Sequence, residues 1–264
     1  MARIVTVHSN RGGTGKSHLA ANLASLIACS GARVGLLDTA LQSAGLHQLF
    51  GLTLTGGSPT LATYLGGGCE IEDALYDVSS VVDAAASGGR LLLVPSSANP
   101  RDTADLLNRG YDLGLLADAC SQLIERHDLD LLLLDTHPGL SNESSLSIAL
   151  ADIAVLVVRP DGVSAIPPPD PAVSTYQWPR RLVVVNMLPS GGDEAALRDQ
   201  LRADVGVDPV AVIPFSNELG GLNSERVFAC DFPQDQLVGQ FRRIVGELMA
   251  GAERPGPSQA GKEG

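Results

Sequence analysis

The chain has 264 residues, of which 44% are hydrophobic and only 4% aromatic, and its formal net charge is −12 at pH 7. This length suits one large α/β domain or two small ones, with a core filled by aliphatic side chains. The negative charge disfavours broad contact with nucleic acid or anionic lipid. The four cysteines include no Cys-x-x-Cys pair, which argues against a disulfide framework or a zinc site. No apolar run reaches the roughly 18 residues of a membrane span and we see no signal peptide, so we expect a cytoplasmic protein.

Short apolar runs alternate with helical stretches along residues 1–250. The runs are mostly continuous, which is typical of strands buried on both faces of a parallel sheet. The expected strands are Arg3–His8, Arg33–Leu37, Arg90–Val94, Leu129–Leu134, Ile153–Val158, Arg181–Val185 and Val210–Ile213. The expected helices are Ser17–Cys29, Thr103–Arg126, Asn142–Leu150, Asp193–Ala203 and Gln234–Met249. This order predicts one α/β domain with a doubly wound, mostly parallel sheet and helices on both faces.

Two stretches depart from this pattern. Ile166–Pro171 reads IPPPDP, which cannot continue a helix. Residues 251–264 are polar and rich in glycine and proline, and are predicted to form a disordered tail. The apolar stripe of Gln234–Met249 is expected to pack on the sheet. No second amphipathic helix follows it, so we expect no membrane anchor.

The sequence GGTGKS, Gly12 to Ser17, lies between the first expected strand and the first expected helix, which is the context of a phosphate-binding loop. Glycines let successive backbone N–H groups point at phosphate oxygens, and the helix N-terminus adds partial positive charge. Lys16 would neutralise phosphate charge, and the Ser17 hydroxyl would contact Mg²⁺. The predicted nucleotide-binding residues here are Gly12, Gly13, Thr14, Gly15, Lys16, Ser17 and His18.

Asp135 ends the apolar run of LLLLDTHPGL, residues 131–140. Ligands bind at the carboxyl ends of strands in open α/β sheets. A carboxylate at that edge can orient Mg²⁺, so Asp135 is predicted as a metal ligand with Ser17.

The string RGGTGKS, Arg11 to Ser17, resembles the deviant Walker A motif of the MinD/ParA family, and the resemblance runs from about Ala2 to Met249. It implies an ATPase that binds Mg²⁺-ATP, forms a homodimer around two nucleotides and positions cellular cargo or division machinery with a protein partner. A signature lysine opens the motif in that family. Arg11 stands there in this chain and keeps the charge, although the general preference of this sequence for arginine explains it equally well.

The stretch LLDTALQSAG, residues 36–45, resembles the family's switch I, where an Asp-x-Asp pattern is usual. Asp38 is present, but Ala40 replaces the second aspartate, which positions the attacking water. Losing such a group commonly costs a factor of roughly 10² to 10⁴ in rate. Asp38 is expected to assist with water, and Lys16, Arg11 and Asp38 are the predicted catalytic residues.

The resemblance also implies that Asn186 and Pro214 flank the adenine ring. A strand-end asparagine that caps a turn is the alternative for Asn186.

Three functions remain open at this stage. The first is a MinD/ParA-like ATP-dependent dimerising switch or slow ATPase. The second is a catalytically impaired ATP-binding scaffold that recruits a protein partner, because Ala40 cannot orient water. The third is a metabolic P-loop enzyme, for which no second catalytic constellation is visible. DNA binding stays open but is not favoured, since the last helix offers only Arg242 and Arg243 as a basic pair.

Overall fold

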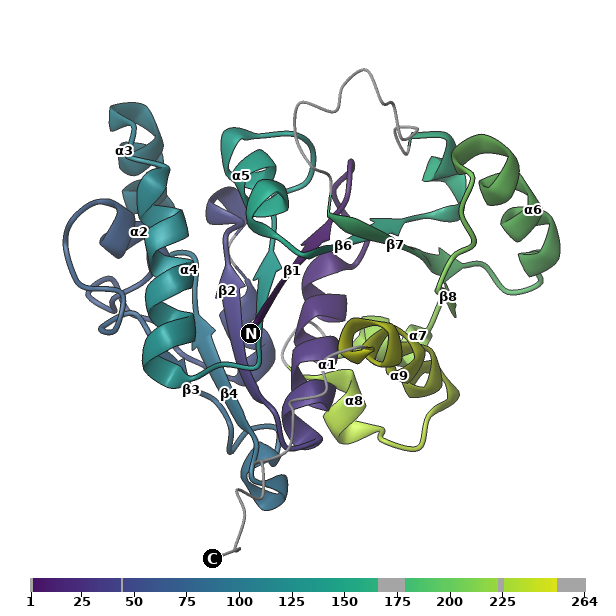
Figure 1. The fold of residues 1–264 in the computed structure, drawn as a ribbon, viewed down its shortest axis with the longest axis horizontal. Coiled ribbons are helices and arrows are strands. Elements are labelled where there is room, and N and C mark those ends of the chain that lie inside the picture. Colours follow the sequence, from purple (N-terminus) through teal and green to yellow (C-terminus); the bar gives the residue numbers. More distant parts are fainter. Residues whose placement is uncertain (1, 44, 166–178, 223–225, 251–264) are drawn as a thin grey trace, which may run out of the picture.

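The computed structural model describes residues 2–43, 45–165, 179–222 and 226–250. Within these residues, eight strands form one sheet in the order β3-β4-β2-β5-β1-β6-β7-β8 (Figure 1). All neighbouring strands pair in parallel except β3 and β4, which are antiparallel. The strands are β1 Arg3–His8, β2 Arg33–Asp38, β3 Tyr76–Asp77, β4 Arg90–Val94, β5 Leu131–Asp135, β6 Ile153–Val158, β7 Arg180–Leu188 and β8 Ala211–Pro214. The predicted fold class is therefore confirmed.

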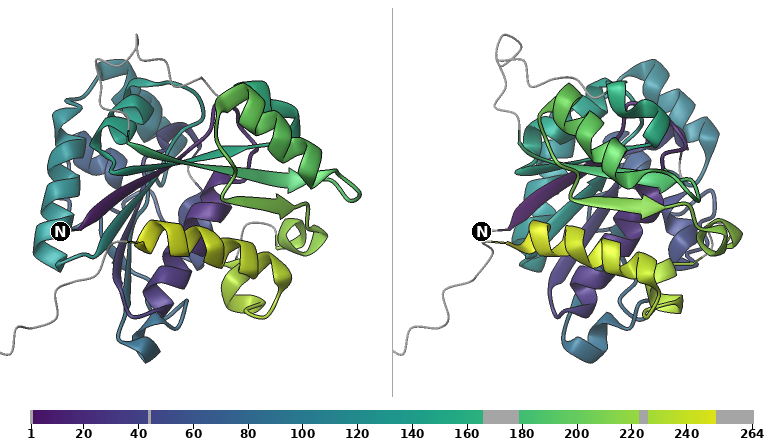
Figure 2. Two further views of the ribbon diagram at one scale, coloured as in Figure 1. Left: turned by 45° about the vertical axis from the view of Figure 1, so that its right-hand side comes forward. Right: turned by 90° about the vertical axis from the view of Figure 1, so that its right-hand side faces the viewer.

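Helices cover both faces of this sheet (Figures 1 and 2). Helices α1, α8 and α9 pack on one face, α2 and α4 pack on the other, and α6 packs beside β7 and β8. The helices are α1 Lys16–Cys29, α2 Leu61–Leu65, α3 Pro100–Arg109, α4 Gly114–His127, α5 Asn142–Leu150, α6 Glu194–Val205, α7 Asn217–Gly221, α8 Phe228–Asp231 and α9 Gln236–Met249. The short 3-10 helices are η1 Leu41–Ser43, η2 Leu46–Phe50, η3 Ala84–Ser87 and η4 Pro160–Ala165.

Strand β5 shows why the apolar runs are continuous. Leu131 and Leu133 belong to the core under α1, whereas Leu132 and Leu134 belong to the core under α4. Successive side chains of a strand point to opposite faces, so a strand covered on both sides needs an apolar residue at every position. This burial fixes β5 in the middle of the sheet, where its end can serve a site.

The single helix predicted over Thr103–Arg126 is wrong, because the structure has two helices there. Helix α3 begins earlier, with the Asn99 side chain accepting a hydrogen bond from the Arg101 N–H at its N-terminus. It ends at Gly110, whose φ of 73° is outside the helical region and suits glycine. Helix α4 then starts at Gly114. The break matters for function because α3 lies beside η1, next to the candidate site.

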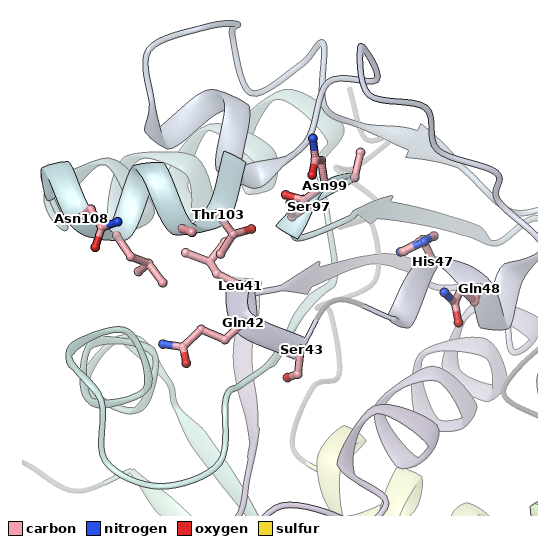
Figure 3. A pocket seen from close by; sticks show the side chains of 12 residues that line it. Leu41, Gln42, Ser43, His47, Gln48, Ser97, Asn99, Thr103 and Asn108 are labelled. Atoms are coloured by element: carbon pink, nitrogen blue, oxygen red, sulfur yellow. Dashed lines mark hydrogen bonds between the residues drawn. The ribbon is translucent and has the colours of Figure 1, made fainter. Parts of the chain in front are cut away.

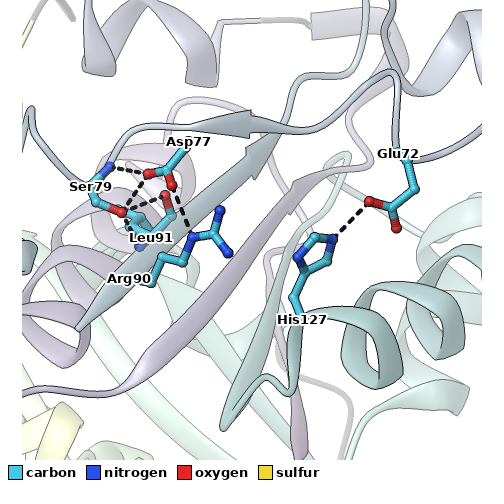
Figure 4. A network of polar contacts seen from close by, with 6 residues as sticks. All are labelled: Glu72, Asp77, Ser79, Arg90, Leu91 and His127. Atoms are coloured by element: carbon cyan, nitrogen blue, oxygen red, sulfur yellow. Dashed lines mark hydrogen bonds and ion pairs between the residues drawn. The ribbon is translucent and has the colours of Figure 1, made fainter. Parts of the chain in front are cut away.

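The β3 edge of the sheet, which the sequence analysis did not predict, is held by a polar network (Figure 4). The Asp77 carboxylate accepts hydrogen bonds from the Ser79 N–H and hydroxyl and pairs with Arg90 at 2.9 Å. Nearby, His127 of α4 contacts Glu72 at 2.9 Å. Charged pairs on a two-residue edge strand discourage further strand pairing, so this edge ends the sheet.

Several predictions fall outside the described residues. The Pro-rich Ile166–Pro171 and the predicted tail 251–264 both lie there. Of the described helices, none combines the length and the apolar character that crossing a bilayer requires.

Candidate functional site

The predicted site residues gather at the carboxyl ends of β1, β2 and β5. In the register of the sheet, Asp135 of β5 lies between Val7 of β1 and Asp38 of β2. The phosphate loop leaves β1 after His8 and enters α1 at Lys16. The sheet therefore brings the glycine-rich loop and two carboxylates to one edge.

The loop backbone depends on its glycines and on a side chain from β7. Gly13 and Gly15 have φ angles of 70° and 85°, which L side chains rarely adopt. A Cβ atom on Gly15 would also lie 2.5 Å from the Asn186 amide nitrogen. That nitrogen donates to the Thr14 carbonyl at 2.8 Å, while the Asn186 amide oxygen accepts from the Met187 N–H at 2.9 Å. Asn186 thus braces the phosphate loop, a contact that sequence reasoning did not foresee.

Lys16, Ser17 and Asp135 lie together under this loop. The Lys16 side chain is buried, and burial lowers its pKa, while the Asp135 charge opposes that shift. Burial raises the pKa of the Asp135 carboxyl, and the Ser17 hydroxyl and the Lys16 charge offset part of this effect. Both Asp135 oxygens are buried, and neither has a hydrogen bond of ordinary geometry from a described residue. A buried carboxylate in this state is costly unless a cation joins it.

Asp38 is also buried, but both of its oxygens are occupied. One accepts from the Ala40 N–H at 3.1 Å, and the other accepts from the Ser96 hydroxyl at 2.9 Å. Burial raises the Asp38 pKa, and the neighbouring Asp135 charge raises it further. Only 1% of Asp38 and 3% of Ala40 is exposed. A water molecule would therefore reach Asp38 only if switch I moved.

His8, at the end of β1, is a site residue that sequence reasoning missed. The Thr136 hydroxyl donates to the Val7 carbonyl at 3.0 Å, so its oxygen is left to accept from His8 Nδ1 at 2.9 Å. This assigns the proton of the neutral ring to Nδ1. Burial and the Lys16 charge lower the His8 pKa to about 4, which keeps the ring neutral at pH 7.

Arg11 and residues Thr136 to Gly139, which directly follow β5, lie near the start of the phosphate loop. Arg11 is exposed and lines a hollow of about 230 Å³ together with Arg159 and Asp161. The Gly139 N–H donates to the Ser9 carbonyl at 2.9 Å. The segment from Thr136 to Gly139 is therefore tied to the loop that precedes the phosphate motif.

A smaller cavity of about 130 Å³ opens beside the first turn of α1. His18, Asn186, Pro214 and Phe215 line it together with Gly15. The Phe215 ring is 55% exposed. Mostly apolar walls with one amide at the rim suit a flat heterocycle. Asn186 and Pro214, the residues predicted to flank adenine, both line this cavity.

The residues that belong to a recognisable motif could be predicted from the sequence. Residues that contact those motif residues from elsewhere in the chain could not. Ser96 reaches Asp38 from the end of β4, 58 residues away along the chain. No local pattern marks it, although its position directly after a buried strand is a usable signal. His8 offered the same signal, as a polar residue that ends an apolar run.

Comparisons with known proteins agree with this geometry. Residues 1–63 match the ParA family described as NUBPL iron-transfer P-loop NTPase. An uncharacterised ATP-binding protein of Methanocaldococcus jannaschii is 30% identical over 161 residues, which are 61% of this chain and 54% of that protein. The chain thus spans about half the length of this relative.

Two further comparisons span nearly the whole chain. The antiactivator FleN of Pseudomonas aeruginosa is 27% identical over 254 residues, which cover 92% of this chain and 85% of FleN. The septum site-determining protein MinD of Pyrococcus horikoshii, solved with Mg-ADP, superposes with a TM-score of 0.74 at 21% identity. That match covers 97% of this chain and all of the solved one.

Proposed function

Because the chain belongs to the MinD/ParA family of P-loop ATPases, we propose that it is a nucleotide-dependent switch that binds Mg²⁺-ATP, dimerises and hydrolyses it slowly. The observation that carries this proposal is the Asp135 carboxylate. Its two buried oxygens have no hydrogen bond of ordinary geometry from a described residue, and the Ser17 hydroxyl and the Lys16 charge are the groups that act on it. A nucleotide with its cation would supply the missing partner.

Magnesium fits the donor set at this position. Mg²⁺ binds proteins through one or two carboxylates together with phosphate oxygens and water. Asp135 and Ser17 supply such donors, and the described part of the chain has no group of three or more His, Cys, Asp or Glu that could hold a metal by itself. We infer that the ion arrives with the nucleotide. When bound, it neutralises charge on the phosphates.

Different residues around the loop would then bind the phosphates and the base of the nucleotide. The N–H groups of Gly12 to Gly15 and the Lys16 ammonium would hold the phosphates. His18, Asn186 and Pro214 would enclose the base in the 130 Å³ cavity. Arg11 is exposed, and we propose that it reaches the phosphates of a second copy of the chain rather than its own.

A second candidate function, the catalytically impaired scaffold, is favoured by the state of Asp38. Both of its oxygens already accept hydrogen bonds, and Ala40 has no side-chain group that could orient water. In this reading the chain binds ATP, stays dimeric for a long time and recruits a protein partner. The relative FleN is named an antiactivator, which supports a protein as the partner of this chain. We also propose that this chain acts in the cytoplasm.

Mass measurement by light scattering after gel filtration tests the proposal. We expect the wild-type chain to shift from monomer to dimer with Mg²⁺-ATP, and Lys16→Ala to stay monomeric. Lys262→Ala, at the only other lysine, is the matched control and should behave as wild type. If adding Mg²⁺-ATP changed neither the measured mass nor the melting temperature of the wild-type chain, the proposal would be overturned.

A further inference from the structure

A cavity of about 640 Å³ lies between the 3-10 helices that follow β2 and helix α3 (Figure 3). It is separate from the phosphate loop, and its volume falls in the range of roughly 300–1,000 Å³ that is usual for small-ligand sites. Four primary amides border it, and these belong to Gln42, Gln48, Asn99 and Asn108.

The lining of this cavity carries no formal charge. None of the residues that border it is Lys, Arg, Asp or Glu, although the whole chain has 48 of these residues. The one titratable group is His47, and burial lowers its pKa, so the ring is neutral at pH 7. A charged ligand would lose its hydration without gaining an opposite charge from the lining. The cavity therefore suits an uncharged ligand that forms hydrogen bonds.

Thr103, in the first turns of α3, shows where such a ligand would be held. Only 4% of this residue is exposed, and its hydroxyl has no hydrogen-bond partner in the described structure. Its side chain borders the cavity, as does Ser97 on the neighbouring loop (Figure 3). The Ser97 hydroxyl, in contrast, already donates to the Asn99 carbonyl at 3.0 Å. A buried hydroxyl without a partner is unfavourable, and a ligand that reaches the hydroxyl from the cavity would relieve that cost.

We propose that this cavity is a second ligand-binding site, for an uncharged ligand that presents amide groups, and that the Thr103 hydroxyl anchors it. A primary amide offers both donors and acceptors, so Gln42, Gln48 and Asn108 can each pair with another amide, while Asn99 offers its NH₂ group because its oxygen accepts from the Arg101 N–H. Leu41 and Leu107 provide apolar surface for the carbon atoms of the ligand. The amide belongs either to a free small molecule or to an uncharged segment of a partner protein.

The walls of this site adjoin switch I. Leu41, Gln42 and Ser43 directly follow Ala40, whose N–H bonds to Asp38. Ser97 directly follows Ser96, whose hydroxyl bonds to the other Asp38 oxygen. Occupancy of the cavity is thereby coupled to the position of the Asp38 carboxylate. This coupling, unlike the binding itself, rests on the proposed nucleotide switch.

Binding is tested on the full chain by NMR of labelled leucine methyl groups, with N-acetyl-L-glutamine amide as the uncharged probe and N-acetyl-L-glutamate as the charged one. We expect saturable shifts of the Leu41 and Leu107 methyl signals with the amide and not with the carboxylate. Ala104→Trp fills the cavity from an exposed position of α3 and should abolish these shifts. Asp105→Trp, next along the helix and outside the lining, should keep them. Absence of saturable shifts, or equal shifts in both tryptophan variants, would overturn the site.

Two further measurements refine the result. Thr103→Val keeps the shape and removes the hydroxyl, and should weaken probe binding by about two- to tenfold, as expected for one hydrogen bond. An unchanged affinity would overturn the anchoring role. An acetylated, amidated Gln-Ser-Gln peptide that binds at least tenfold more tightly than the single amide would point to a partner segment, and equal affinity to a free small molecule. The binding assay needs no ATP turnover, so it can fail or succeed independently of the proposed nucleotide switch.

Discussion

The loop after β1 and the loop after β2 lie at the same edge of the sheet, but they differ in how many of the side chains expected for nucleotide binding and hydrolysis they carry. The first has glycines with positive φ angles, the buried Lys16 and, next to it, the Asp135 carboxylate, whose oxygens have no hydrogen bond of ordinary geometry. The second has an alanine where a water-positioning carboxylate is usual, and its one aspartate is occupied by Ala40 and Ser96. The first loop therefore carries the groups expected to hold phosphates, whereas the described part of the second loop has no side chain free to position water. We predict that nucleotide binding and nucleotide hydrolysis are separable in this chain.

Among changes in the first loop, we expect Lys16→Ala to weaken nucleotide binding the most. The buried Lys16 ammonium should contribute a charge-assisted hydrogen bond to the phosphates, and such bonds are worth about 1.5–3 kcal/mol. Lys16→Ala should therefore weaken Mg²⁺-ATP binding by about 10- to 150-fold in isothermal titration calorimetry. An affinity within a factor of two of wild type would show that the loop does not hold phosphate.

Gly15→Ala tests the shape of the same loop. The variant combines a positive φ with a clash against the Asn186 amide, so the melting temperature should fall by about 3–10 °C. Gly191→Ala is the control, because Gly191 has a φ of +78° but open space around its Cβ position. It should lose only about 2–4 °C. Equal losses in the two variants would mean that the contact between Asn186 and the loop is unimportant.

Much of the first loop could be predicted from sequence, and much of the second could not. A motif of adjacent residues between a strand and a helix fixed Gly12 to Ser17, and an apolar run fixed β5 with Asp135 at its end. Ser96 acts on Asp38 from a strand far away in sequence, so no local pattern reveals that contact. Asn186 was predicted as a neighbour of adenine, but its hydrogen bond to the Thr14 carbonyl of the first loop was not predicted. The predicted helix over Thr103–Arg126 failed for a related reason. Its residues favour a helix on both sides of Gly110, and the break that begins at this glycine and ends before Gly114 divides it.

The buried carboxyl groups of Asp38 and Asp135 make a pH prediction. Burial and the neighbouring Asp135 charge raise the Asp38 pKa to about 7 in the folded state, so the folded state binds the proton more tightly than the unfolded state does. Stability from this group is then present at low pH and is lost as pH rises above about 4 through the folded pKa. Asp38→Asn removes the charge. The melting temperature of this variant relative to that of wild type should therefore increase as pH rises from 5 to 8. A constant difference between the two proteins across this range would contradict the buried pair.

The smallest expected effect concerns Ser96. Ser96→Ala removes one hydrogen bond to the Asp38 carboxylate, which costs about 1–2 kcal/mol, or about 2–6 °C in melting temperature. The loss should be larger at pH 8, where Asp38 is charged, than at pH 5. Ser97→Ala, which removes a bond to the Asn99 backbone instead, should show no such pH dependence. The same pH dependence in both variants would remove the specific link between Ser96 and Asp38.

A single-turnover experiment tests the separation of binding from hydrolysis most directly. Excess protein is mixed with γ-³²P-ATP and Mg²⁺, and samples are quenched over time to follow bound ATP and released phosphate. The median enzyme turns over at about 10 s⁻¹, and the missing water-positioning group should slow this by roughly 10² to 10⁴, to about 0.1 to 10⁻³ s⁻¹. The account predicts that ATP binds fully and remains intact for tens of seconds or longer. Complete conversion of bound ATP within about one second, in the purified chain alone, would contradict it.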